Sequence, residues 1–173
     1  MKTHTEGGHE VDSDRLTVGL SEWRVAADGE TLVSSGVGSS VVVALYDPRT
    51  GVAGLVRAVL PRQSEASAPR SSAPPAKYAD TAVREALEAM IEAGASYAAV
   101  QGWLVGGSEM FDLDRLSAGT AGRTVETAAE TLDRLNVDVV GRAVGGDHGR
   151  TVELDAATGE VSLRTAHHGT RHL

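Results

Sequence analysis

The chain has 173 residues, 41% of them hydrophobic, which is enough for one ordinary domain with its own core. Its 24 acidic and 16 basic residues give a net charge of −8, which argues against nucleic acid or anionic lipid as a partner. The complete lack of cysteine excludes disulfides, thiolate metal sites and a cysteine nucleophile.

No apolar run is long enough to span a membrane, and no charged-then-apolar leader is present. We therefore expect a cytoplasmic protein without membrane insertion. Lys2 and Lys77 are the only lysines, and arginine supplies the other strongly basic side chains. This acidic, lysine-poor balance suggests a halophilic source, and a genome of high GC content that favours arginine is the alternative explanation.

In the first half of the chain, short runs rich in β-branched residues predict strands separated by glycine-bearing turns. These strands are placed at Arg15–Leu20, Glu22–Ala26, Thr31–Ser35, Ser40–Tyr46 and Val52–Leu60. Residues 1–14 are polar and are expected to form an unstructured tail. The segment 64–75 is rich in serine, alanine and proline, which predicts a flexible loop within the domain rather than a domain boundary.

The second half predicts two helices and further strands. Helical spacing of Val83, Leu87 and Met90 predicts a helix over Thr81–Ala93 with Asp80 as its N-cap, and a second amphipathic helix follows over Ala121–Leu135. Strands are expected at Ala98–Val105, Val137–Ala143, Thr151–Leu154 and Val161–Arg164. The pattern predicts one α/β domain over residues 15–165 and an unstructured C-terminal tail over 166–173. Trp23 and Trp103 lie in predicted strands and are expected in the core.

Short runs spread along the chain carry a resemblance to one family. They are Gly36–Val43 (GVGSSVVV), Tyr46–Pro48 (YDP), Gly54–Pro61 (GLVRAVLP), Lys77–Asp80 (KYAD), Gly106–Phe111 (GGSEMF), Gly145–Arg150 (GGDHGR) and Thr158–Val161 (TGEV). In this order they resemble the CheD family of chemoreceptor glutamine deamidases over most of the predicted domain.

The resemblance implies a fold, a reaction and a set of partners. The fold is a layered α/β sandwich of mixed β-sheet with two main helices. The reaction is hydrolysis of a receptor glutamine amide to glutamate with release of ammonia, which needs no cofactor. The partners are methyl-accepting chemoreceptors, CheC-like phosphatases and, in archaea, adaptors that reach the motility motor.

The same resemblance places the family's catalytic residues on three positions of this chain. A nucleophilic cysteine corresponds to Ser40, a basic histidine to Arg57, and an orienting threonine to Ser34. The family's 17-residue interval between nucleophile and base is kept, yet each occupant differs. Serine holds its proton more tightly than a thiol, and arginine stays protonated with no lone pair to accept one. Arg57 could instead bind an oxyanion or a carboxylate, which would make the site a binding pocket.

The histidines offer few substitutes for the missing base. His148 is the internal candidate, and its GGDHGR motif predicts a glycine-shaped turn with an exposed side chain. His167, His168 and His172 could hold a metal loosely, but we prefer a solvated tail, and no metal is expected.

The run Gly106–Phe111 lacks the ending of a phosphate-binding loop, so we do not expect it to bind a nucleotide. The resemblance implies that Gly106 and Gly107 permit close backbone approach. It also implies that Met110 and Phe111 either pack in the core or present a surface for a partner.

Two functions therefore stay open. One is a noncatalytic adaptor that keeps the CheD fold and binds a CheC-like phosphatase or chemoreceptors. The other is an active receptor glutamine deamidase that uses Ser40 as its nucleophile. We favour the adaptor, because a shaped surface survives the loss of a nucleophile and a base.

Overall fold

The computed structural model describes residues 14–66, 73–109 and 119–173. Its strands are β1 (Arg15–Thr17), β2 (Glu22–Ala26), β3 (Thr31–Val37), β4 (Val41–Tyr46), β5 (Ala53–Ala58), β6 (Gln101–Gly106), β7 (Asp138–Val144), β8 (Arg150–Asp155), β9 (Val161–Thr165) and β10 (Gly169–His172). The α-helices are α1 (Ala79–Glu92) and α2 (Thr120–Arg134), and the 3₁₀ turns are η1 (Gln63–Glu65) and η3 (Tyr97–Ala99).

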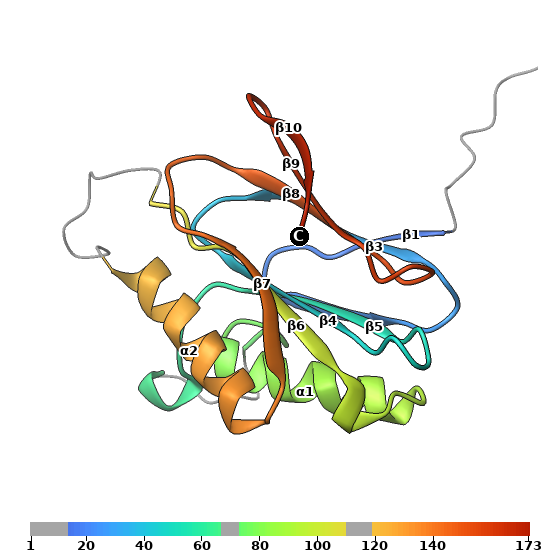
Figure 1. Cartoon of the computed structure of the whole chain (residues 1–173). Coiled ribbons are helices and arrows are strands. Elements are labelled where there is room, and N and C mark those ends of the chain that lie inside the picture. The colour runs from blue at the N-terminus through green and yellow to red at the C-terminus, as the bar shows by residue number, and fades with distance from the viewer. Residues whose placement is uncertain (1–13, 67–72, 110–118) are drawn as a thin grey trace, which may run out of the picture.

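In this part of the chain the elements form three layers (Figure 1). One five-stranded sheet has the order β1-β3-β8-β9-β10, and the other has the order β2-β5-β4-β6-β7. Both sheets are mixed, because β1 pairs with β3 and β6 pairs with β7 in parallel while the other neighbours are antiparallel. Helices α1 and α2 cover one face of the second sheet, and the first sheet covers its other face. The predicted α/β layered sandwich is confirmed.

Strand β4 lies at the centre of this arrangement, and every one of its residues is buried. Val41, Val43 and Leu45 belong to the core under the helices. The alternate residues of β4 belong to the core between the two sheets. Side chains of a strand point alternately to its two faces, so a strand covered on both sides needs a continuous apolar run. That requirement explains the sequence VVVALY.

The helix α1 packs an alanine-rich face, completed by Val83, Leu87 and Met90, on the second sheet. The sheet makes room for it at Gly54, where a Cβ atom would stand 2.9 Å from the Sδ of Met90. The predicted cap is corrected by two positions: the helix begins at Ala79, with Tyr78 rather than Asp80 at the N-cap. The Asp80 carboxylate accepts hydrogen bonds from the backbone N–H groups of Thr81 and of Gln63, the first residue of η1.

The prediction of an unstructured tail over residues 166–173 is corrected by strand β10. This strand pairs antiparallel with β9, with Gly169 opposite Thr165 and His172 opposite Ser162. All four of its residues are exposed, so no apolar alternation marks the strand in the sequence. Its backbone hydrogen bonds are supplied by β9, and the resulting hairpin projects away from the helices (Figure 1).

Several other expectations have mixed outcomes. Trp103 is buried as predicted, and Trp23 is partly buried against the core under the helices. Residues 1–13 of the predicted N-terminal tail and 67–72 of the predicted loop lie outside the described residues. Within the described ranges, neither helix has the length and hydropathy needed to cross a bilayer.

Candidate functional site

Three residues that the sequence singled out meet where the two sheets come together at one end of the sandwich. Ser40 ends the loop before β4, Arg57 lies in β5 and Ser34 lies in β3. Ser34 and Ser40 are both buried, and the Arg57 side chain is half-buried. Arg57 shares a strand face with Leu55, which packs between the sheets, so its side chain reaches from the second sheet toward β3.

Arg57 makes four hydrogen bonds in this cluster. Its Nε donates to Ser40 Oγ at 3.0 Å, and its Nη1 donates to Ser34 Oγ at 3.3 Å. Nη1 also donates to the carbonyl of Ser35 at 2.7 Å, and Nη2 donates to the carbonyl of Gly36 at 2.9 Å. A guanidinium carries five N–H donors, so these bonds leave only one for any other acceptor. The arginine therefore links β5 to β3 and to the loop that carries Ser40.

The electrostatics of the cluster are those of a fixed cation among neutral oxygens. Burial lowers the pKa of the Arg57 guanidinium, yet all of its bonds are donated, as a protonated group requires. The Ser34 hydroxyl donates to the carbonyl of Val18 at 2.8 Å. Among the described residues, the hydrogen-bond partner of Ser40 Oγ is the donor Arg57 Nε, so no acceptor is in place to take the proton of Ser40.

The three predicted positions are thus brought together, and their catalytic role stays a prediction. The 17-residue interval is explained by the fold, because antiparallel pairing of β4 with β5 sets Val42 opposite Arg57 and so places Ser40 beside it. Position 36 adds a constraint: Gly36 has a positive φ of 62°, which turns its carbonyl toward Arg57 and favours glycine.

The glycine pair at the end of β6 lies directly against this cluster. Gly106 has a φ of 102°, and a Cβ atom there would stand 2.4 Å from the carbonyl oxygen of Ser40. The N–H of Gly107 donates to that same oxygen at 2.9 Å, and Ser108 donates to Gly38 at 3.0 Å. The two glycines therefore permit the close backbone approach that the resemblance implied.

A role for this loop in partner binding stays a prediction. Gly106 and Gly107 are buried, so they shape the loop without forming its outer surface. Met110 and Phe111, which were predicted to pack in the core or contact a partner, lie outside the described residues.

Among the described residues, no histidine takes part in the hydrogen bonds of the cluster. His148 is in the turn between β7 and β8, with its side chain 39% exposed, and its ring faces Asp147 and His168. His172 pairs with Glu160 across the β9–β10 hairpin at 2.7 Å. In the described part of the chain no group of three or more metal-ligating side chains is assembled.

A second arginine, which the sequence analysis quoted only as part of a motif, is also buried. Arg150 donates from Nη1 to Ser108 Oγ at 2.9 Å and from Nη2 to the carbonyl of Gly145 at 2.7 Å. The sequence pattern that could have indicated a buried Arg150 is an arginine at the start of a strand, directly after a glycine-rich turn.

Comparison with known proteins decides the family. A family model described as "CheD chemotactic sensory transduction" matches residues 59–165. The chain belongs to the CheD family. It is 38% identical to the "Probable chemoreceptor glutamine deamidase CheD" of Haloarcula marismortui over 95% of this chain and 92% of the relative.

Further CheD relatives come from other organisms. The chain is 37% identical to the "Probable chemoreceptor glutamine deamidase CheD" of Natronomonas pharaonis, over 87% of this chain and 88% of the relative. It is 34% identical to the "Chemoreceptor glutamine deamidase CheD" of Bacillus subtilis, over 91% and 95%. In this chain a serine and an arginine occupy the positions that the resemblance assigns to the nucleophile and the base, and this assignment stays a prediction.

Proposed function

We propose that this chain is a noncatalytic adaptor of the chemotaxis system, which keeps the CheD fold to dock on methyl-accepting chemoreceptors or on a CheC-like phosphatase in the cytoplasm. The observation that carries the proposal is the hydrogen bond from Arg57 Nε to Ser40 Oγ. A general base must accept the proton of the nucleophile. Here a donor occupies that place, so Ser40 stays a weak nucleophile.

The surroundings of Arg57 support the same conclusion. With four of its donors used by protein oxygens, the guanidinium has little capacity left to bind an oxyanion or a substrate carboxylate. Among the described residues, no imidazole or carboxylate hydrogen-bonds to Ser40, and His148 lies in a turn with partners of its own. The cluster therefore serves to join strands.

The docking surface that we propose is the loop after β6, at the end of the sandwich that Ser40 occupies. Gly106 and Gly107 hold this loop against the Ser40 carbonyl, and Met110 and Phe111 would supply its apolar anchors. The similarity to relatives from Haloarcula and Natronomonas supports an archaeal source, in which motility adaptors are further candidate partners.

An active deamidase is the second candidate. It is supported by the names of the relatives and by the survival of hydroxyl groups at positions 34 and 40, in contact with the same residue. It would require a base that the cluster does not contain.

The two functions are separated by one pair of measurements. The protein is incubated with a chemoreceptor cytoplasmic fragment, and intact-mass spectrometry follows the small mass increase that accompanies conversion of glutamine to glutamate. We expect no conversion above the buffer control, and binding of the fragment that is unchanged in Ser40→Ala. We expect weaker binding in Phe111→Ala. Conversion by the natural sequence that disappears in Ser40→Ala would overturn the adaptor proposal.

A further inference from the structure

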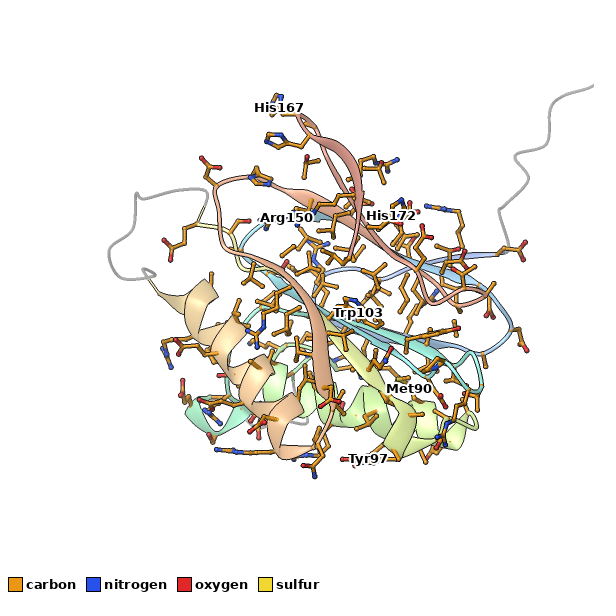
Figure 2. All side chains as sticks on the ribbon, viewed as in Figure 1. Met90, Tyr97, Trp103, Arg150, His167 and His172 are labelled. Atoms are coloured by element: carbon orange, nitrogen blue, oxygen red, sulfur yellow. The ribbon has the colours of Figure 1, made fainter. Side chains whose placement is uncertain are left out.

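A pocket of about 300 Å³ lies at the base of the β9–β10 hairpin, and Ser34, Ser40 and Arg57 do not line it. Its polar lining comes from Arg150 at the start of β8, His148 in the preceding turn, Thr165 at the end of β9, and His168 and Arg171 of the hairpin. Figure 2 shows Arg150 below the hairpin, whose tip carries His167. A neighbouring hollow shares Arg150 and Thr165 and adds Arg164.

The charge of this pocket runs against that of the chain. The protein carries a net charge of −8, yet neither an aspartate nor a glutamate lines the pocket. Burial is the main cause that lowers the pKa of the Arg150 guanidinium, and the positive charge of the nearby Arg171 lowers it further. The Asp147 carboxylate contacts the pocket residue His148 at 3.4 Å, and its side chain is 92% exposed. Among the described residues, the pocket thus gathers cations with no carboxylate in its lining.

The environment of Arg150 indicates that the pocket is a preorganised binding site. The residue is only 7% exposed, and its guanidinium is oriented by Ser108 Oγ and the carbonyl of Gly145. Both acceptors are neutral, and within the described ranges no carboxylate forms an ion pair with Arg150. Buried charges in proteins are ordinarily paired, because a low-dielectric site penalises an isolated ion. A second guanidinium, that of Arg171, increases this penalty, and an anion between the two would relieve it.

We propose that this pocket binds a phosphate group between Arg150 and Arg171. The chemistry favours a tetrahedral oxyanion over a carboxylate, because two arginines, two histidines and Thr165 line the pocket from several elements. A phosphate group offers enough oxygens to accept from all of them, whereas a carboxylate offers two. The pocket volume exceeds that of a bare phosphate ion, given that a water molecule occupies about 30 Å³, so we infer that the phosphate group is attached to a small organic molecule.

Amide ¹H–¹⁵N spectra of the full chain test the proposal during titration with inorganic phosphate, O-phosphoserine or glutamate. Ionic strength is held constant with sodium chloride, so that general screening does not change. We expect saturable shifts at Thr165, Gly169 and Arg171 with both phosphate probes, and tighter binding of O-phosphoserine than of the free ion. Tighter binding of inorganic phosphate would identify the free ion as the ligand and overturn the assignment of an organic substituent.

Matched variants locate the binding. Arg171→Gln removes an exposed cation of the pocket, and Arg49→Gln removes an exposed cation from the turn between β4 and β5. We expect Arg171→Gln to weaken phosphate binding at least tenfold and Arg49→Gln to leave it unchanged, with both variants folded. Unsaturable shifts, equal binding in Arg171→Gln and the natural sequence, or equal binding of glutamate would each overturn the proposal.

Discussion

Restoring the family's nucleophile and base in this chain should create a deamidase. The perturbation is the double variant Ser40→Cys/Arg57→His. Arg57 Nε stands 3.0 Å from Ser40 Oγ, and the Nε2 of an imidazole is separated from its Cα by the same number of bonds as an arginine Nε. A histidine at position 57 can therefore place an acceptor nitrogen beside a thiol at position 40, which is the geometry of an activated cysteine.

The expected gain and cost can both be estimated. Disabling the nucleophile or base of a comparable hydrolase lowers turnover by about 10⁴-fold or more, so the double variant should exceed the natural sequence by a similar factor. The histidine cannot reproduce the hydrogen bonds to the Ser35 and Gly36 carbonyls. Those carbonyls lie at an exposed edge where water replaces the lost donor, so the cost to the free energy of unfolding is about 1–2 kcal/mol.

The assay is mass spectrometry of a chemoreceptor fragment, with chemical denaturation of each variant as the measure of folding. The control Ser35→Cys/Arg57→His puts the thiol on an exposed neighbour and should stay inactive. In Ser40→Cys alone, the pH dependence of alkylation by iodoacetamide should give a lower thiol pKa than in Ser35→Cys, because a guanidinium lowers the pKa of an adjacent thiol, but this variant should not deamidate. A folded double variant without deamidase activity would refute the claim that this cluster keeps the geometry of the family's active site.

Three further predictions concern stability. Gly106→Ala should lower the free energy of unfolding by about 3 kcal/mol, from clash and backbone strain, whereas Gly94→Ala, with a similar φ of 107° but open space around it, should cost about 1 kcal/mol. Asp47→Ala should cost about 1–3 kcal/mol in denaturant titrations, since it removes the acceptor of partly buried donors from Arg49, Thr50 and Ser96. Burial raises the pKa of Asp47, but these hydrogen bonds outweigh burial and hold the pKa below its usual value. The stability that this carboxylate contributes is therefore present above about pH 4 and is lost as the pH falls further. Asp47→Asn should weaken this pH dependence. If the source is halophilic, circular dichroism should show fuller folding in molar salt than in dilute buffer, and equal folding in both would contradict that origin.

The part of the fold that the sequence predicts well is the part with a strong local pattern. The apolar run of β4 and the helical spacing of α1 predict their elements within about two residues, because burial dictates both patterns. Strand β10 could not be predicted in this way. Its residues are exposed, and it exists through hydrogen bonds to β9 that no periodicity records.

The candidate site was predictable only in its positions. The resemblance located residues 34, 40 and 57, and antiparallel pairing of β4 with β5 brings two of them together. The resemblance could not predict that Arg57 donates hydrogen bonds to the Ser35 and Gly36 carbonyls, because these bonds depend on the positive φ of Gly36 and on the approach of β3. Arg150 was overlooked for a related reason. Arginine is seldom buried, and its burial here depends on Ser108, which is distant in sequence.

The two arginines play parallel mechanical roles at the same end of the sandwich. Arg57 extends from β5 in one sheet to β3 in the other, and Arg150 extends from β8 to the residues that follow β6 and β7. Between them, Gly107 donates to Ser40 and ties the two loops together. A hydrolytic base has to accept and release protons in each turnover. A guanidinium committed to neighbouring carbonyls instead fixes the loops in one arrangement, which reduces the entropy lost when a partner binds them. Under the adaptor proposal, an arginine at position 57, where the resemblance places a histidine, would suppress turnover and favour docking.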